Sequence, residues 1–381
     1  MKYILNDIAV ITSSKRIFAN EYQSTGIPFY RGKEITQLYN HKAFSDLLYI
    51  SEKKYNELIQ NVGVPQENDI LITAVGTIGS LYLVNKDDKF YFKDGNLIWL
   101  KNIDKTKVIP KYLYYLLSTD ETHSLIDSIT IGSTQTALTI EGVKMLNFDF
   151  PELKVQQHIV DTIGSIDDLI ELNDKKIQLL TIFGKQLYDK ILLTNNHKKI
   201  QLNKLVSIYR GASPRPIQDY VVDKGKPWVK ISDATSISNP FLFETKEFIN
   251  TEGVKHSFEV YPNDFILSNS ATPGLPIFIQ INACVHDGWL IIRNFKKISP
   301  EYLYWVLKKD RNHLLSLGNG SIFTNLKTEI LKTHEVPIFD DTTMESINTK
   351  FKKIIYTMKN LVENNNKLNN IKNILLKKYF G

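Results

Sequence analysis

Two groups of chemically reactive side chains lie in the second half of the chain. Cys284, His286 and Asp287 bring together a thiol, an imidazole and a carboxylate, the groups found in thiol nucleophiles and in metal sites. Asp233 precedes the Glu244-Thr245-Lys246 run by eleven residues, a loose spacing that could hold Mg²⁺ for nuclease chemistry. Short matches of this kind often arise by chance, so each needs independent support.

The motifs of two other chemistries are missing. An Asn-Pro-Pro-aromatic or Asp-Pro-Pro-aromatic motif, which would receive a flipped base for methylation, is absent, and residues 238–242 contain only one proline. No Gly-x-x-x-x-Gly-Lys-Ser/Thr loop is present for ATP. We therefore expect methyl transfer and ATP hydrolysis to belong to partner proteins.

The elements that position the reactive side chains come from a duplication. Segments recur in the same order with a period near 190 residues, far above the range of solenoid repeats, which predicts a pair of similar domains. The paired segments are residues 5–11 and 202–208, 27–31 and 226–230, 65–72 and 261–268, 94–98 and 287–291, and 110–114 and 300–304. Two similar domains in one chain favour a bivalent reader.

The duplication argues against both reactive groups as sites. Aligning Asp94 with Asp287 places Tyr91 at Cys284 and Lys93 at His286, so the framework is kept without the thiol or the imidazole. The Asp233, Glu244 and Lys246 group has no counterpart in the first half by sequence alignment. We therefore interpret both groups as structural.

Each half closes with a segment that has the apolar spacing of a coiled coil. Both seams step alternately by four and three residues over ten layers. The first seam is interrupted only at Asn173 and Gly184, the second only at Asn365 and Lys372. The apolar seam residues are Ile159, Ile163, Ile166, Ile170, Ile177, Leu180, Leu187 and Ile191 in the first arm and Ile347, Phe351, Ile354, Met358, Leu361, Leu368, Leu375 and Tyr379 in the second.

The buried asparagines fix a register for pairing the two arms. An antiparallel alignment with Ile159 opposite Tyr379 places Asn173 opposite Asn365, where each amide can satisfy the other. Between residues 159 and 193 the first arm has six acids and four bases, whereas the second arm has one acid and eight bases between residues 347 and 379. The opposite charge balance favours the same pairing.

Composition limits the class of protein. The chain of 381 residues has a net charge of +6, and this excess lies entirely after residue 200, because residues 1–200 contain 23 bases and 24 acids. One cysteine excludes a disulfide framework and suits a reducing cytosol, and Asp7 comes too early for a signal peptide. No apolar run approaches the length of a membrane span. We expect a cytoplasmic protein.

The end of the first half carries a family resemblance. Residues 132–139 (Gly-Ser-Thr-Gln-Thr-Ala-Leu-Thr) are followed by Phe-Pro-Glu-Leu at 150–153, Gln-Gln-His-Ile-Val at 156–160 and Ile-Asp-Asp-Leu-Ile at 166–170. This run closely resembles the end of a target recognition domain and the start of a central helix in specificity subunits of Type I restriction-modification systems. The resemblance covers essentially the whole chain, including the order of domain, helix, domain and helix. The second arm departs from it, because Thr342-Thr343-Met344-Glu345 replaces the usual glutamine-rich helix opening.

The resemblance implies a non-catalytic subunit that reads a split recognition sequence in double-stranded DNA. It further implies two adenine-N6 methyltransferase (modification) subunits and ATP-driven restriction subunits as partners. No cofactor is expected on this chain. S-adenosylmethionine, ATP and Mg²⁺ are expected on the partner subunits.

Readout of DNA needs amide, guanidinium and hydroxyl groups on structured loops, with cations that meet phosphates. A turn-stabilising role stays open for each candidate. In the first half the candidates are Lys15, Arg16, Arg31, Lys33, Thr73, Thr77, Ser133, Thr134 and Gln135. In the second half they are Arg210, Arg215, Lys230, Ser268, Asn269, Ser270, Thr272, Asn319, Ser321, Thr324 and Asn325.

Together these patterns predict an α+β protein with two pseudo-symmetric β-rich target recognition domains separated by a long antiparallel two-helix coiled coil of roughly 48 Å. The expected domains are residues 1–150 and 202–336, the spacer helices 151–195 and 337–381, and the linker 196–201. Two alternatives stay open at this point. One is an adaptor with two protein-binding domains on a coiled coil, and the other is a stand-alone nuclease that uses Asp233, Glu244 and Lys246.

Overall fold

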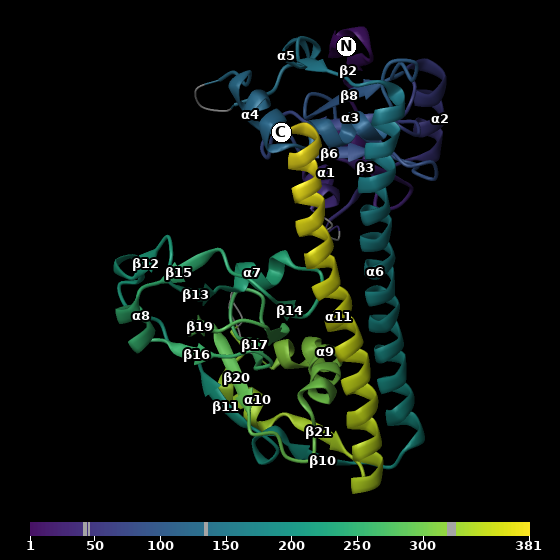
Figure 1. Ribbon diagram of the computed structural model, residues 1–381. Helices are drawn as coiled ribbons and strands as arrows, with labels where there is room; N and C mark the ends of the chain where they lie inside the picture. The colour runs from purple at the N-terminus through teal and green to yellow at the C-terminus, as the bar shows by residue number, and fades with distance from the viewer. Residues whose placement is uncertain (41–43, 45, 133–135, 318–324) are drawn as a thin grey trace. The chain divides into compact units, whose positions relative to one another are not determined.

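The computed structural model divides into two compact units (Figure 1), and it describes residues 1–40, 44, 46–132, 136–317 and 325–381. Unit 1 consists of Met1–Leu169 together with Lys367–Gly381. Unit 2 consists of Ile170–Asn366. Each unit therefore contains one β-rich domain and a part of both long helices.

Unit 1 contains three small sheets. A two-stranded sheet joins β1 (Lys2–Ile4) to β9 (Asn147–Asp149). A four-stranded sheet has the order β2 (Val10–Thr12), β8 (Leu97–Lys101), β5 (Ile70–Thr73) and β6 (Leu81–Leu83). A three-stranded sheet has the order β4 (Leu48–Ile50), β3 (Ile27–Tyr30) and β7 (Tyr91–Phe92). The helices are α1 (Gly32–Tyr39), α2 (Glu52–Asn61), α3 (Pro110–Leu117), α4 (Asp120–Ser128), α5 (Ile140–Lys144) and the first part of α6 (Leu153–Thr194).

Unit 2 repeats this plan with longer sheets. β10 (Lys198–Gln201) pairs with β21 (Glu335–Ile338). One five-stranded sheet has the order β11 (Ser207–Arg210), β20 (Trp289–Arg293), β17 (Phe265–Ser268), β18 (Pro276–Ile279) and β14 (Phe241–Leu242). The other has the order β12 (Val221–Val222), β15 (Glu247–Ile249), β13 (Lys226–Val229), β19 (Ala283–Val285) and β16 (Phe258–Val260). The helices are the second part of α6, α7 (Ile231–Ser236), α8 (Thr251–Lys255), α9 (Pro300–Ser316), α10 (Thr328–Thr333) and the first part of α11 (Asp341–Phe380).

Strand register shows that the two units are copies of one fold. In unit 1 Ile70 of β5 lies opposite Leu100 of β8, and in unit 2 Phe265 of β17 lies opposite Ile292 of β20. Every residue of β5 and of β17 is buried, as expected for central strands that are covered on both faces. The sequence duplication is thus a duplication of structure.

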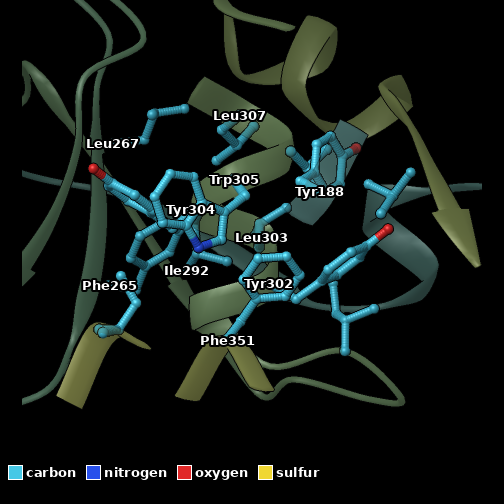
Figure 2. Close-up of a cluster of buried hydrophobic side chains, with 14 of the residues drawn as sticks. Tyr188, Phe265, Leu267, Ile292, Tyr302, Leu303, Tyr304, Trp305, Leu307 and Phe351 are labelled. Atoms are coloured by element: carbon cyan, nitrogen blue, oxygen red, sulfur yellow. The ribbon is translucent and has the colours of Figure 1, made fainter. Parts of the chain in front are cut away.

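The aromatic side chains of α9 form the centre of the core of unit 2 (Figure 2). Tyr302 and Trp305 both pack against Phe351 of α11, with ring centroids 6.1 and 6.0 Å apart. Tyr188 of α6 joins the same group at 5.9 Å from Tyr302. Since these rings are buried, the helix-spaced aromatic residues build the core and not a binding surface.

Parts of α6 and α11 pair antiparallel within each unit. In unit 2 the side-chain Nδ2 of Asn173 donates to Oδ1 of Asn365 at 2.8 Å, the pairing that the sequence predicts, while Tyr188 lies beside Phe351. The Nδ2 of Asn365 also donates to Oδ1 of Asp174 at 2.8 Å and to the carbonyl of Ile170 at 3.5 Å, so this buried amide has three partners. Satisfied in this way, the polar layer fixes the register locally.

In unit 1 the two long helices pair through a charged layer. The Nζ of Lys372 lies 2.7 Å from Oδ1 of Asp167, and the hydroxyl of Tyr115 donates to Oδ2 of the same carboxylate at 2.7 Å. Lys372 interrupts the apolar seam in the sequence. The tertiary structure supplies its counter-charge from α6 and a ring from α3.

Three elements differ in their bounds from those expected, and the first long helix covers Leu153–Thr194 instead of residues 151–195. Residues 198–201, expected to be part of a linker, form strand β10, because their backbone pairs with β21 from Lys198 opposite Ile338 to Gln201 opposite Glu335. The second long helix begins at Asp341 and not at residue 337, because residues 335–338 are used in that strand pair. Among the described residues, no helix has the length and apolarity that crossing a membrane requires.

Candidate nucleic-acid interface

Three loops of unit 2 meet at Asp287, in the loop before β20. Oδ1 of Asp287 accepts from the hydroxyl of Ser213 at 2.8 Å, and Oδ2 lies 3.2 Å from Nη2 of Arg215. Its backbone carbonyl accepts from Nε of Arg210 at 3.1 Å and from Nδ2 of Asn269 at 3.2 Å. One residue thus ties together the loop after β11, the turn after β17 and its own loop, which we call the Asp287 loop cluster.

The electrostatics of this cluster keep its carboxylate charged. Partial burial opposes ionisation, but the hydrogen bond from Ser213 and the charge of His286 outweigh it and leave the pKa of Asp287 below its ordinary value. Burial lowers the pKa of the adjacent His286. At neutral pH the cluster therefore presents an anionic Asp287 that faces the cationic Arg215.

The turn between β17 and β18 is rigidly braced. The buried hydroxyl of Ser268 donates to the carbonyl of Thr272 at 2.6 Å and accepts from the backbone N–H of Leu275 at 2.9 Å. Nε of Arg311 on α9 donates to the carbonyl of Pro273 at 3.0 Å. These bonds hold the tip of the turn, residues 270–272, in a fixed conformation.

Unit 1 builds a related arrangement, with fewer contacts, at Asp94. Oδ2 of Asp94 accepts from Nε of Arg16 at 2.9 Å, and the neighbouring Gly95 N–H donates to the hydroxyl of Ser13 at 3.3 Å. The buried hydroxyl of Thr73 bonds the carbonyl of Thr77 and the N–H of Ser80, as Ser268 does in unit 2. We call this the Asp94 loop cluster.

A fourth segment joins each cluster through the same backbone hydrogen bond. The N–H of Leu138 donates to the carbonyl of Ala74 at 2.8 Å in unit 1, and the N–H of Leu326 donates to the carbonyl of Asn269 at 2.8 Å in unit 2. The chain just before each leucine includes the predicted reading segments. Ser133, Thr134, Gln135, Asn319, Ser321 and Thr324 lie outside the described residues.

A large hollow adjoins the Asp287 loop cluster. It has a volume of about 1100 Å³ and is lined by both polar and apolar side chains. Arg215 and Lys230, two predicted DNA-binding residues, line it together with Gln218, Trp228 and His286. The hollow is wide enough for a large polar group to approach these side chains.

The cations at the start of α1 and α7 are held by acids of their own unit. Arg31 forms two hydrogen bonds to Glu34, from Nε to Oε2 at 3.0 Å and from Nη2 to Oε1 at 2.6 Å, which raise the pKa of its guanidinium. Lys230 lies 2.5 Å from Glu247. Lys33 pairs with Asp46. These side chains are less free to meet a ligand than Arg16 and Arg215.

The nuclease interpretation is wrong because Asp233 has a structural role. Its buried carboxylate accepts from the backbone N–H of Lys230 at 2.8 Å and caps α7, and Glu34 accepts from the N–H of Arg31 at 2.7 Å in the same way on α1. Asp233 thus has a counterpart in the first half after all, which sequence alignment missed because the two acids differ in type. Both acids therefore act as helix caps.

The predicted DNA-binding residues that the structure describes divide into exposed, partly exposed and buried ones. Lys15, Arg16, Lys33, Thr77, Arg210, Arg215 and Asn325 are exposed, and Arg31, Lys230, Ser270 and Thr272 are partly exposed. Thr73, Ser268 and Asn269 are buried, with 0, 0 and 6% of their surface accessible. The prediction that these three contact DNA is corrected, because their polar atoms are used inside the turns.

The sequence-based candidates omitted Asp94, Asp287, Ser213 and Gln218. The repeated Asp-Gly pair at residues 94–95 and 287–288 was a visible signal, but acids are seldom chosen as DNA contacts. Cys284 is fully buried in β19, and burial raises the pKa of its thiol, as expected for a structural cysteine. Among the residues that the structure describes, no group of three or more His, Cys, Asp or Glu side chains could hold a metal ion.

Residues 1–181 match the family model of the Type I restriction modification DNA specificity domain. A putative type I restriction enzyme specificity subunit of Haemophilus influenzae is 32% identical over 166 residues, which are 43% of this chain and 40% of that protein. A putative type I restriction enzyme specificity subunit of Methanocaldococcus jannaschii is 21% identical over 292 residues, or 71% of this chain and 67% of that protein. The chain thus matches about two fifths of the length of the first relative.

The fold is also that of a solved protein. The structure of the S subunit of a Type I restriction-modification system from M. genitalium aligns with all of this chain and 96% of that one, with a TM-score of 0.60 and 16% sequence identity. The likeness at this level of identity is one of fold.

Proposed function

We propose that this chain, whose residues 1–181 match the family model of the Type I restriction modification DNA specificity domain, is the non-catalytic DNA-reading subunit of a Type I restriction-modification complex. The observation that carries the proposal is the construction of the same loop cluster twice, around Asp94 in unit 1 and around Asp287 in unit 2. Each cluster presents an exposed arginine on braced loops, the setting in which a fixed side chain can discriminate base pairs.

Each unit would read one half of a split recognition sequence. Exposed cations such as Lys15 and Arg210 would meet phosphates and position the unit, while the tips of the braced turns would face base edges. Because the turn tips differ in sequence between the units, the two half-targets would differ as well. Phosphate contacts predict that affinity falls steeply as the salt concentration rises.

Catalysis would belong to partner subunits. We assign methyl transfer to two adenine-N6 methyltransferase subunits that bind S-adenosylmethionine, and DNA cleavage to restriction subunits that use ATP and Mg²⁺. The complex would act in the cytoplasm. This division is supported by the missing catalytic motifs and by the family of residues 1–181.

The methyltransferase subunit would contact an exposed apolar face of α6. Within unit 2 this helix exposes Leu172, Leu179, Ile182 and Phe183, between 47 and 65% of each residue. Water-exposed apolar side chains gathered on one helix favour contact with a protein partner. Replacing Leu179 by Glu should abolish co-purification with the methyltransferase subunit, whereas Thr235→Glu, at an exposed polar position of α7 away from this face, should not.

A selection experiment tests the function. The chain alone and the chain with its methyltransferase subunit are each incubated with a random pool of DNA duplexes, and the bound duplexes are sequenced. Enrichment of two short conserved blocks separated by a fixed unread spacer is expected. The adaptor interpretation instead predicts no enrichment under either condition, and that result would contradict the proposal.

A further inference from the structure

The arginines of the two loop clusters share an unusual setting. In each unit an arginine from the loop after the first strand of the main sheet meets an aspartate from the loop before the second strand. The side chain of Arg16 is 69% exposed and that of Arg215 is 79% exposed, although both are ion-paired. An isolated exposed ion pair adds little stability, so stability alone does not explain why the duplicated domains both contain one.

Each aspartate leaves part of the guanidinium free for a ligand. Arg16 uses its Nε toward Asp94, and its two Nη atoms have no partner among the described residues. Arg215 uses Nη2 toward Asp287, and its Nε and Nη1 likewise have no described partner. A guanidinium held on one side in this way presents its remaining N–H groups in a fixed direction.

The aspartate also selects the kind of acceptor that the arginine can meet. A carboxylate about 3 Å from the guanidinium repels a phosphate, since both are anions. The O6 and N7 atoms of guanine are uncharged acceptors that match the arginine fork in the major groove. By contrast, Arg31 is bound by Glu34 through two nitrogens and only 27% of its side chain is exposed.

We propose that Arg16 and Arg215 are specificity-determining residues that each read one guanine in their half of the target, and that Asp94 and Asp287 are the residues that position them. This inference rests on the proposed function and adds the base that each unit recognises. It predicts a G·C pair in both halves of the recognition sequence. Asp94 and Asp287 touch no base in this arrangement and act through the arginines.

The test uses the complex of the full chain with its methyltransferase subunit. Duplex selection and methylome sequencing are performed for the wild type and for Arg16→Lys, Arg215→Lys, Asp94→Asn and Asp287→Asn. Lysine keeps the charge that a phosphate contact needs but lacks the fork that guanine needs. The matched controls are Lys107→Ala and Lys297→Ala. Both are ion-paired cations three residues before Pro110 and Pro300, beyond the opposite ends of β8 and β20; the Lys107 side chain is 35% exposed and that of Lys297 is 54% exposed.

Arg16→Lys should relax one G·C position in the first half-target only, and Arg215→Lys one position in the second half only. Affinity for the wild-type target should fall about five- to 150-fold, while binding to random DNA and the salt dependence stay unchanged. The aspartate variants should relax the same positions, with melting temperatures close to that of the wild type. The control variants should leave both half-targets intact.

Three results would overturn the inference. The first is a uniform loss of affinity on all sequences with a salt slope smaller by about one, which identifies a phosphate contact. The second is an unchanged preference in the arginine variants, and the third is a wild-type half-target without a G·C pair. A wild-type complex that selects no split sequence would contradict the proposed function itself, and that outcome is separate from all three.

Discussion

Trp305 of α9 packs against Gly184 of α6 so closely that a side chain at residue 184 would overlap the indole ring. This contact explains why the apolar seam of the first long helix is interrupted by a glycine. The equivalent aromatic residue in unit 1 is Tyr115, whose hydroxyl donates to Asp167 beside Lys372. Helix α9 thus meets α6 through an apolar contact in unit 2, and its counterpart α3 meets α6 through a polar contact in unit 1.

Gly184→Ala should destabilise unit 2 by about 1 to 3 kcal/mol, because the added methyl group must displace a large buried ring from a packed core. Alanine normally stabilises a helix relative to glycine, so the same substitution at a helix position without this contact would increase the stability. Urea denaturation measures the change. Gln186→Ala, at an exposed position of the same helix, is the control, and equal stability of the two variants would show that Trp305 moves away without cost.

Asn173→Leu or Asn365→Leu alone should cost about 1 to 3 kcal/mol, because each removes the hydrogen bond between the two amides, of which that of Asn365 is buried and that of Asn173 partly buried. The loss should be smaller for Asn173→Leu, since Asn365 keeps its hydrogen bond to Asp174. The double variant should recover most of the loss. Thermal melts of the four proteins form a double-mutant cycle, and zero coupling would mean that the two amides do not meet in solution.

Asp287 should titrate below the ordinary aspartate value of 3.8, because the Ser213 hydrogen bond and nearby positive charge outweigh the effect of burial. A lowered folded pKa means that its contribution to stability is present above the unfolded pKa and is lost only as the pH falls through the lower folded value. NMR of carboxyl carbons measures the midpoint. Ser213→Ala should raise it, whereas Ser232→Ala, at an exposed hydroxyl of α7, should leave it unchanged.

Replacing residues 1–150 by the corresponding segment of another specificity protein should change one half of the target and preserve the other. The reason is that each loop cluster is built from residues of its own unit. Methylome sequencing after the exchange gives the new target. A change in both halves would show that the units do not read independently.

The purified chain alone should show no methyltransferase, nuclease or ATPase activity. The expectation follows from the missing methylation and ATP motifs and from the capping role of Asp233. Methyl transfer to DNA by the isolated chain with S-adenosylmethionine would contradict it, provided that the same preparation lacks a co-purified methyltransferase.

The sequence by itself determined the duplication, the two long helices and the register at Asn173 and Asn365. These features depend on periodic patterns, and a four-three apolar spacing with one polar layer specifies its own alignment. The fold class followed for the same reason, because the repeated strand and turn patterns are local. The family resemblance rested on contiguous residues such as 150–153, which are also local.

Only the tertiary structure decided which polar side chains are free to bind. Thr73, Ser268 and Asn269 have suitable chemistry and lie in the expected turns, yet they are buried and bonded within them. Arg16 and Asp94 are 78 residues apart, and Arg215 and Asp287 are 72 apart, so their pairing depends on which loops the sheet brings together. A sequence records the type of each side chain, whereas burial and long-range partners are set by the packing of the whole unit.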